Sequence, residues 1–396
     1  MDLLSPAVVE NPYPAFRELR EYEPAHWSNE HNAWLITRFE DVIRGYKDPR
    51  LSSAHISNLF QGPQDAPSQK LLDGWMEFRD PPDHTRLRKL VQKAFTPKVV
   101  ESLKPRIQEI ANDLIENLNP QTPEDLVKHF AYPLPAIVIG EMLGVPSTDR
   151  EQFQSWSNEI KNLIFGIGDE RERRVTARKG LFELRKYFER ILSELHKNPR
   201  DGLLNSLVEA KEANEKLTAD EVIGTCVLLL FAGHETTTNL IANGILALSK
   251  QPQDVRNLFS DQENSSRVVE EVLRFEGPLK LMVRSAKTNL SLKGQKIRKS
   301  DRVFLIQASA NRDERQYEDP DKFWPSRKDR PHLAFGHGIH FCLGAPLARI
   351  EGQIALGELF TRFPRLKVDT HKPSWEASIL SRSLKELPTI LEPQEG

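Results

Sequence analysis

The sequence predicts a mainly α-helical protein with small β-sheets, an α+β fold, in a single domain covering residues 1–396. Apolar residues recur with the 3.6-residue helical period in several long segments, whereas the alternating pattern of strands is confined to a few short ones. No Gly/Ser-rich linker, composition shift or internal repeat divides the chain. One mostly helical domain is therefore the simplest interpretation.

The elements are expected in the following order along the chain. A first strand is expected at 33–37, a helix after Pro81-Pro82, and further strands at 283–292 and 303–308. Thr218 and Glu221 belong to a capping-box pattern that starts the longest helix. The helices with a clear apolar period are 101–118, 149–165, 176–197, 218–250, 265–276 and 345–363.

Composition and charge exclude several classes of function. Lys and Arg number 55 and Asp and Glu 57, and a net charge of -2 gives no bias toward nucleic acid. The first 16 residues lack a basic start and a long apolar run, and the apolar run 226–233 is far shorter than the ~20 residues of a membrane span. Cys226 and Cys342 lie far apart and imply no disulfide framework. We therefore expect a soluble cytoplasmic protein, with neither membrane nor nucleic acid as a partner.

Cys342 is the most informative residue, because it lies in a glycine-rich loop, 335–344. Gly336, Gly338 and Gly344 allow sharp turns and the close approach of a flat ligand. The helix that begins next presents unpaired N–H groups, which favour a negatively charged sulfur. A lone cysteine is more often a small buried hydrophobic residue, but the glycine spacing favours a metal-ligating thiolate.

Residues 335–349 resemble the haem-binding loop of the cytochrome P450 haem-thiolate monooxygenases, whose pattern FGxGxHxCxGxxLAR they match. The resemblance implies the cytochrome P450 fold, with haem b (iron protoporphyrin IX) held between a long distal helix and the cysteine loop. It implies that Cys342 ligates the iron and pushes electron density toward bound oxygen. It also places Phe335, Gly336, Gly344 and Ala348 against the haem.

The middle of the long helix reads Ala-Gly-His-Glu-Thr-Thr at 232–237. Small residues let a flat ring approach a helix, and a threonine hydroxyl can bond a carbonyl or a ligand. The resemblance implies that Ala232 contacts the haem and that Glu235 and Thr236 deliver protons to dioxygen. Without it, both would more often be surface or packing residues. The zinc-hydrolase motif HExxH is absent, because its fifth position is Thr238.

Further support for the cofactor is expected from charged residues. Glu271 and Arg274 are three apart on a helix, and the resemblance implies a buried structural network with Arg327. Trp324 stands where the family frequently has an acidic residue. Haem propionates need cations and hydrogen-bond donors, which are more often surface residues when taken singly. The resemblance assigns this role to His84, Arg88, Arg284 and His340.

The substrate is expected to be a hydrophobic small molecule, such as a terpenoid, steroid, fatty acid or polyketide-like compound. Apolar residues in the loop 53–78, the segment 160–168 and the segment 279–283 are expected to line its pocket, although each is more often core. Lys280 is expected to be exposed, or else to meet a substrate carboxylate. The expected substrate contacts are Trp75, Met76, Phe165, Phe231, Leu279, Leu281, Met282 and Val283.

Electrons are expected from a separate ferredoxin or flavodoxin with its reductase, because no flavin or nicotinamide fingerprint is visible. Five basic residues form either a basic patch for that partner or an ordinary solvated surface, namely Arg86, Lys89, Lys93, Lys98 and Arg349. The expected protein is a monomeric monooxygenase that uses O2 as co-substrate. A peroxide-driven haem-thiolate oxygenase and a non-catalytic haem-binding or sensing protein are alternatives, and Glu235 and Thr236 count against both.

Overall fold

The computed structural model describes residues 1–54, 71–72, 74–165, 170–198, 202–212, 215–328, 331–369 and 374–392. The chain forms two compact units. The first consists of Met1–Leu51, Leu103–Pro135 and Thr236–Gly396, and the second of Ser52–Ser102 and Ala136–Glu235. Helices α8 (Pro133–Met142) and α12 (Ala219–Ser249) contribute residues to both units. The prediction of a single domain stays a prediction.

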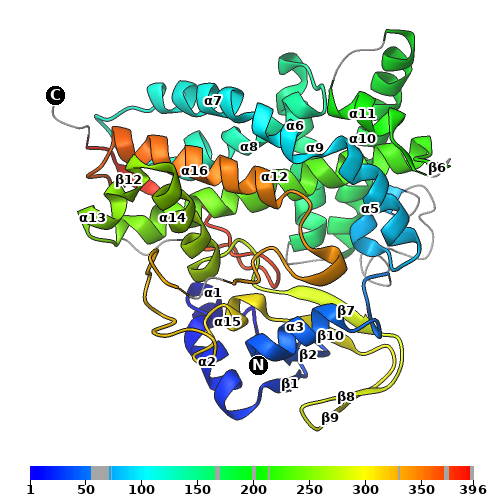
Figure 1. Ribbon diagram of the computed structural model, residues 1–396, viewed down its shortest axis with the longest axis vertical. Helices are drawn as coiled ribbons and strands as arrows, with labels where there is room; N and C mark the ends of the chain where they lie inside the picture. Colours follow the sequence, from blue (N-terminus) through cyan, green and yellow to red (C-terminus); the bar gives the residue numbers. More distant parts are fainter. Residues whose placement is uncertain are drawn as a thin grey trace. The chain divides into compact units, whose positions relative to one another are not determined.

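The first unit contains a five-stranded sheet in the order β1-β2-β10-β7-β3 (Figure 1). Strand β10 runs parallel to β2 and antiparallel to β7. Alternate residues point to opposite faces, so Leu305 joins one core cluster and Phe304 the other. Both faces of the sheet are therefore buried. The strands are β1 (Ala25–Ser28), β2 (Ala33–Ile36), β3 (Leu51–Ser52), β7 (Met282–Ala286) and β10 (Arg302–Leu305).

Smaller sheets complete the β structure. Strands β11 (Lys367–Val368), β12 (Pro388–Ile390) and β4 (Glu124–Asp125) pair in that order in the first unit. Two-stranded ribbons are formed by β8 (Leu290–Leu292) with β9 (Gln295–Ile297), and by β5 (Lys211–Glu212) with β6 (Glu215–Lys216).

Helix α16 (Ala345–Arg362) of the first unit packs against α7, α14 and η5. The C-terminal half of α12 lies close to α16: a Cβ added at Gly244 would come within 2.9 Å of a Leu356 methyl carbon. The remaining helical segments are α1 (Pro6–Glu10), α2 (Tyr13–Tyr22), α3 (Phe39–Lys47), α7 (Lys104–Glu116), η3 (Val127–Ala131), α13 (Gln253–Arg256), η5 (Asn257–Ser260), α14 (Gln262–Phe275), α15 (Gln307–Ala310) and η6 (Gly338–His340).

In the described part of the second unit, the β structure consists of the β5–β6 ribbon and Ser52 of β3, and the regular structure is otherwise helical. Helix α10 packs along α9, and α5 packs against α11 and η2. Trp75 is stacked between Phe78 and Phe231, with ring centroids 5.5 and 5.7 Å away. The helical segments are η2 (Met76–Phe78), α5 (Asp83–Ala94), α6 (Pro97–Ser102), η4 (Ser147–Asp149), α9 (Arg150–Phe165), α10 (Glu170–Lys197) and α11 (Leu203–Glu209).

The predicted fold class is confirmed, with differences at the element ends. The helix predicted at 101–118 is interrupted between α6 and α7, where Pro105 occupies the first turn of α7. The strand predicted at 283–292 is two strands, and the one predicted at 303–308 ends at Leu305, after which α15 begins. The capping box is confirmed, because Glu221 N–H donates to the Thr218 hydroxyl and Thr218 N–H donates to the Glu221 carboxylate.

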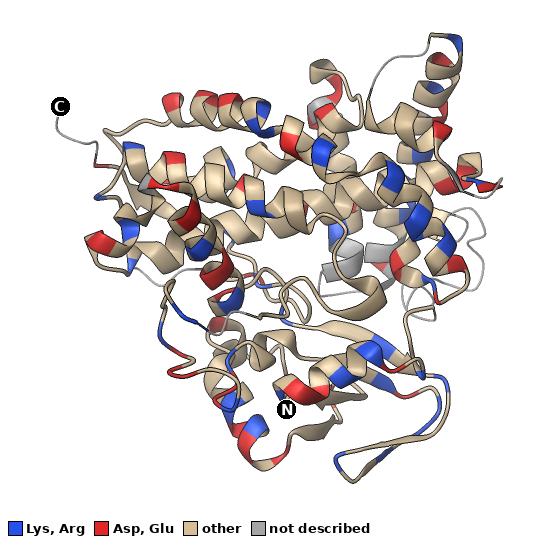
Figure 2. Ribbon diagram, in the orientation of Figure 1, with Lys and Arg blue, Asp and Glu red and all other residues tan. Residues whose placement is uncertain are grey.

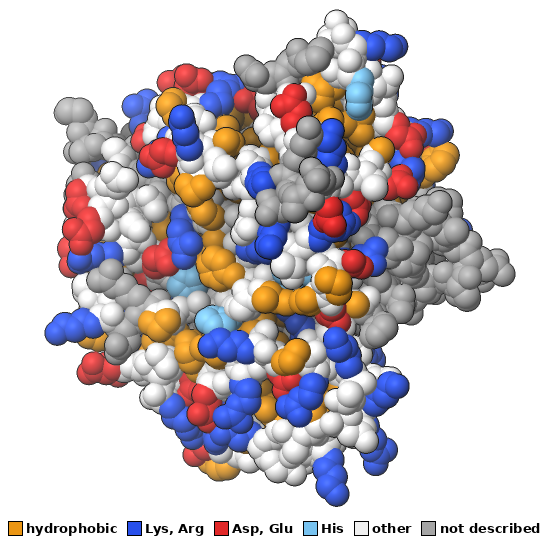
Figure 3. Space-filling view, turned by 45° about the vertical axis from the view of Figure 1, so that its right-hand side comes forward, with side chains coloured by type: hydrophobic (Ala, Val, Ile, Leu, Met, Phe, Trp, Pro, Cys, Tyr) orange, Lys and Arg blue, Asp and Glu red, His pale blue; other side chains and the backbone are white. Residues whose placement is uncertain are grey.

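Acidic and basic residues are interspersed along the ribbon in Figure 2. Their side chains are also interspersed on the face of the molecule that Figure 3 shows. This agrees with the small net charge of -2. Among the residues that the structure describes, no helix is both long enough and apolar enough to cross a bilayer.

Candidate functional site

The glycine loop is shaped by two left-handed residues. Gly336 and Gly338 have φ values of 69° and 73°, which glycine adopts without steric cost. A Cβ added at Gly338 would lie 3.2 Å from the Tyr46 carbonyl oxygen, so the loop rests closely on the end of α3. Gly344 differs, because its φ of -79° suits any residue. A positive φ is therefore found at two of the three glycines, and the close approach of a ligand at Gly344 stays a prediction.

Cys342 lies on the exposed side of this loop, three residues before α16 begins at Ala345. Its backbone N–H donates to the Phe335 carbonyl at 2.9 Å, which closes the loop. The neighbouring side chains of Ile339 and Phe341 are 50% and 39% exposed. A thiol flanked by accessible apolar side chains fits a flat, largely apolar ligand bound through its metal. Cys226, in contrast, is buried in α12.

Helix α12 is buried along nearly its whole length except at one strip. From Val222 to Leu248, only Ala232, Gly233 and Thr236 are not buried. Positions 232, 233 and 236 share one side of a helix, so the accessible strip is narrow and continuous. Thr236 supplies its only side-chain hydroxyl. A strip of small residues open on an otherwise buried helix can accept a flat ring.

Glu235 is buried beside this strip and forms an ion pair with Lys161 of α9, with 2.9 Å between Oε1 and Nζ. The Lys161 side chain is partly exposed. Glu235 therefore connects the interior of α12 with an amine that solvent can reach. No local pattern points to Lys161, because this partner lies 74 residues from Glu235 along the chain.

A second buried carboxyl group lies on the next turn of α12. Thr237 forms a hydrogen bond with Glu351 of α16, and Glu351 is 2% exposed. Burial raises the pKa of Glu351 to about 8, although the Thr237 hydrogen bond favours the charged form. Glu351 is therefore largely protonated at neutral pH. Sequence reasoning missed it because a single glutamate in a helix carries no motif.

The expected propionate ligands occur in both units. In the first unit, the Arg284 side chain is buried, lies 5.6 Å from the Tyr46 ring centroid and donates to the Val283 carbonyl. His340 ends η6 and is half-buried. In the second unit, His84 is buried and Arg88 half-buried, one turn apart on α5 as their spacing predicts.

The structure brings Glu271, Arg274 and Arg327 together. Arg274 donates to both Glu271 carboxylate oxygens at 2.7 and 2.8 Å, and Arg327 Nε lies 3.7 Å from Oε2. All three side chains are buried. Trp324, where the sequence departs from the family pattern, donates its backbone N–H to Glu271 at 2.7 Å. This contact is made by the backbone and so does not depend on the side chain at position 324.

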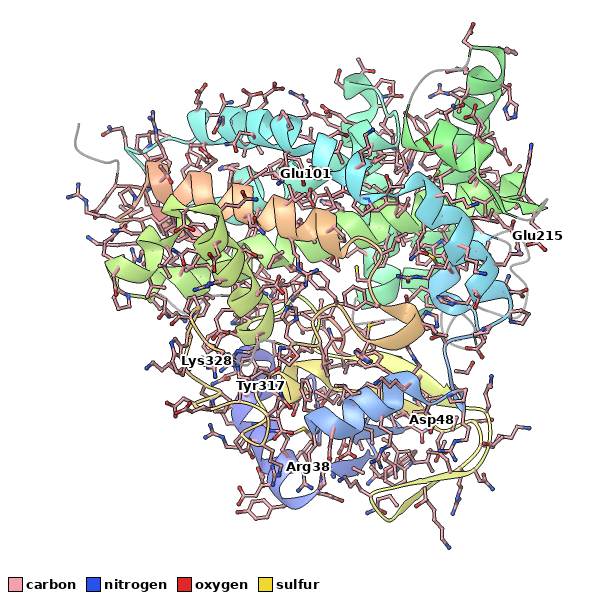
Figure 4. All side chains as sticks on the ribbon, viewed as in Figure 1. Arg38, Asp48, Glu101, Glu215, Tyr317 and Lys328 are labelled. Atoms are coloured by element: carbon pink, nitrogen blue, oxygen red, sulfur yellow. The ribbon has the colours of Figure 1, made fainter. Side chains whose placement is uncertain are left out.

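Tyr317, labelled in Figure 4, packs against the same network. Its ring centroid lies 5.2 Å from the Arg274 guanidinium and 5.9 Å from that of Arg327. Its hydroxyl donates to the Pro331 carbonyl. Burial raises the pKa of Tyr317, so the phenol stays a neutral donor.

The expected substrate contacts fall into different environments. Leu281 is fully buried in the core cluster beside the sheet, where packing alone accounts for its position. Leu279, Met282 and Val283 are only partly buried. Phe165 ends α9, but its side chain lies outside the described part of the chain, as do the loop residues 55–70 and 73 and the segment 166–169. The buried aromatic stack described above contains Trp75 and Phe231, and Met76 follows it in η2.

Lys280 is buried, so the expectation of an exposed side chain is wrong. Its amine donates to the Ser378 carbonyl. Burial, with a smaller effect of the Arg382 charge, lowers the pKa of Lys280 to about 7.

The five residues of the expected basic patch differ in their surroundings. Lys89, Lys93 and Lys98 are exposed, and Figure 2 shows basic residues along α5. Arg86 is paired with Glu221, and Arg349 with Glu270. These two arginines therefore carry compensated charges.

Three comparisons with known proteins identify the family of the chain. A family model described as Cytochrome P450 matches residues 68–264 and 265–390. Putative cytochrome P450 YjiB of Bacillus subtilis is 40% identical over 359 residues, covering 90% of this chain and 88% of YjiB. Vitamin D(3) 25-hydroxylase of Pseudonocardia autotrophica is 38% identical, covering 100% of this chain and 97% of that protein. The structure of CYP109Q5 from Chondromyces apiculatus superimposes with a TM-score of 0.91 at 35% identity, covering 100% and 99% of the two chains.

Proposed function

The chain belongs to the cytochrome P450 family and is a monooxygenase, and we propose that it inserts one oxygen atom of O2 into a hydrophobic small molecule. Two electrons and two protons reduce the other oxygen atom to water. The observation that carries the proposal is the exposed Cys342 thiol on a glycine loop ahead of α16. We propose further that residues 1–396 act as one catalytic domain.

The residues divide into proposed roles around haem b. Cys342 ligates the iron from the loop. Arg284 and His340 of the first unit and His84 and Arg88 of the second bind the propionates. Glu271, Arg274 and Arg327 hold the polypeptide that leads into the loop. The remaining proposed haem contacts are Ala232, Phe335, Gly336, Gly344 and Ala348.

When bound, haem supplies the iron at which dioxygen is reduced. The side chains supply what that chemistry needs from the protein. The Thr236 hydroxyl lies in the accessible strip of α12 and is suited to donate a hydrogen bond to oxygen. Glu235 and its partner Lys161 provide a path for protons from solvent. The acid-alcohol pair favours oxygen activation over the peroxide-driven and non-catalytic alternatives.

Ligation by Cys342 is tested by the absorbance of the reduced carbon monoxide complex. The wild type should show the red-shifted band of thiolate ligation, and Cys342→His should lose it while retaining some haem. Cys226→Ser serves as the control, because that thiol is buried elsewhere in α12. A red-shifted band that persists in Cys342→His would mean that another residue ligates the iron.

The reaction type is tested by supplying either O2 with a ferredoxin system or peroxide alone. We expect product only with O2 and electrons. Product with peroxide alone would support the peroxide-driven alternative, and no product from any substrate that shifts the haem spectrum would support a binding or sensing role.

The proposed substrate class is a hydrophobic terpenoid, steroid, fatty acid or polyketide-like molecule. The proposed contacts are apolar, namely Trp75, Met76, Phe165, Phe231, Leu279, Met282 and Val283. The name of the Pseudonocardia relative describes hydroxylation of vitamin D(3), a hydrophobic compound. A spectral-shift screen of the four compound classes would rank them directly, because displacement of distal water changes the haem spectrum.

We propose that electrons arrive from a ferredoxin or flavodoxin that recognises the exposed lysines of α5. Charge reversal at Lys89 and Lys93 should slow reduction by an acidic ferredoxin, and the effect should weaken as salt is added. Stopped-flow reduction at low and high ionic strength measures this. Unchanged rates at low salt would remove these lysines from the partner site.

A further inference from the structure

Three polar side chains meet beside the first residue of the cysteine loop. Arg349 of α16 donates to the Glu270 carboxylate of α14 through Nε at 2.6 Å and Nη2 at 3.0 Å. His332, which precedes the loop, lies with Nε2 3.1 Å from the same carboxylate. Burial would raise the pKa of Glu270, but the hydrogen bonds that His332 and Arg349 donate to it outweigh this effect and lower the pKa to about 2. Glu270 is therefore a fixed anion.

The orientation of the His332 ring is set on both sides. Its Nδ1 accepts a hydrogen bond from the Ala334 backbone N–H at 3.2 Å, so Nε2 carries the proton that is donated to Glu270. The His332 side chain is only 3% exposed. Its ring therefore has one tautomer and one direction of approach to the carboxylate.

These groups enclose the Phe335 ring. The Arg349 guanidinium lies 4.6 Å from the ring centroid, and the His332 ring centroid lies 5.8 Å from it. The Phe335 carbonyl accepts the Cys342 N–H. Any movement of Phe335 is thus passed to the backbone that carries the thiol.

We propose that Glu270, His332 and Arg349 are positioning residues for Cys342, acting through Phe335, and that Arg349 is not a docking charge for the redox partner. This inference rests on the proposed function of Cys342. The two roles for Arg349 make opposite predictions for Glu270→Gln. If Arg349 positions the cysteine loop, loss of the Glu270 carboxylate loosens that loop. If Arg349 instead docks an acidic partner, the same loss frees the Arg349 guanidinium to bind that partner.

The test uses the holoenzyme of three variants: Glu270→Gln, Arg349→Lys and the double variant that carries both substitutions. Each is compared with a control variant, Glu263→Gln. Glu263 is the matched control, because it also lies on α14 and pairs with an arginine, Arg267, but is 75% exposed. Arg349→Lys keeps the charge and removes the bidentate, planar contact. The readouts are the fraction of the reduced carbon monoxide complex with the red-shifted band, hydrogen exchange of the 333–344 backbone, and the rate of reduction by an acidic ferredoxin.

We expect Glu270→Gln and Arg349→Lys each to convert a large part of the red-shifted band to the blue-shifted form and to speed exchange at Cys342 several-fold. The combined variant should be no worse than either single one. Glu263→Gln should match the wild type. If Glu270→Gln fails to accumulate, Arg349→Lys alone distinguishes the roles, because a docking charge would survive that substitution.

Unchanged spectra and exchange in Glu270→Gln, with faster reduction at low salt, would overturn the inference. Failure of the proposed function is distinguishable, because the wild type itself would then lack the red-shifted band.

Discussion

Thr236 is the side chain of the accessible α12 strip that can form a hydrogen bond, since its neighbours there are Ala232 and Gly233. Thr236→Ala keeps the helix and removes the hydroxyl together with the γ-methyl group. We expect it to lower the amount of product per electron by about tenfold and to release peroxide, because a positioned proton donor contributes factors of this size or more. NADH consumption, product and peroxide measured together check this.

Thr238→Ala is the control for that experiment. Thr238 lies two residues further along the same helix and is buried, so the substitution tests the loss of a threonine without changing the accessible strip. Full coupling in Thr236→Ala, or equal uncoupling in both variants, would contradict the proposed role.

At the scale of elements, α12 approaches the 71–75 segment through two glycines. A Cβ added at Gly224 would lie 2.8 Å from the Gly74 Cα and 2.9 Å from the Leu71 carbonyl oxygen, both backbone atoms. Gly224→Ala should therefore destabilise the protein by about 1–3 kcal/mol, as overpacking does. Gly140→Ala in α8 meets only Val145, at 4.0 Å, and should be neutral or stabilising by up to about 1 kcal/mol. Urea unfolding measures both, and equal effects would contradict the close approach.

The contact between α12 and α16 predicts a pH dependence. Glu351 has a folded pKa of about 8 against an ordinary value of 4.5, so between these pH values the folded state binds more protons than the unfolded state. Its contribution to stability is therefore present below pH 4.5 and is lost as the pH rises to about 8. Glu351→Gln removes this titration.

Between pH 5.5 and pH 8.5, we expect the wild type to lose unfolding free energy relative to Glu351→Gln, because only the wild type loses the stabilisation by protonated Glu351. The slope should not exceed about 1.4 kcal/mol per pH unit. Denaturant unfolding at both pH values measures it, and parallel pH profiles would show that Glu351 does not titrate in this range.

At the scale of the whole molecule, Glu271 joins α14 to the polypeptide that leads to the cysteine loop. Glu271→Gln leaves the buried Arg274 and Arg327 guanidiniums without their anion and should cost about 3–5 kcal/mol. Glu263→Gln alters an exposed pair on the same helix and should cost at most about 1 kcal/mol. Denaturant unfolding compares the two variants, and similar small losses would mean that the network is not structural.

Local patterns account for what could be predicted. The capping box, the long helix 218–250 and the Cys342 loop depend on groups a few residues apart, whose geometry the backbone fixes. The split of the strand predicted at 283–292 and the helix after Leu305 could not be predicted, because apolar spacing in short segments does not distinguish their ends. Lys161 could not be found as the partner of Glu235, because that pairing depends on how α9 packs.

The sequence by itself determined that a cysteine in a glycine-rich loop precedes a helix and that an acid and an alcohol lie together on a long helix, since both depend on adjacent residues. The tertiary structure decided which groups are charged, buried or compensated. It buried Lys280, kept Glu351 largely protonated and engaged Arg349 with Glu270 rather than leaving it as a free charge. The physical reason is that the charge and reach of a side chain depend on partners that packing brings from distant parts of the chain.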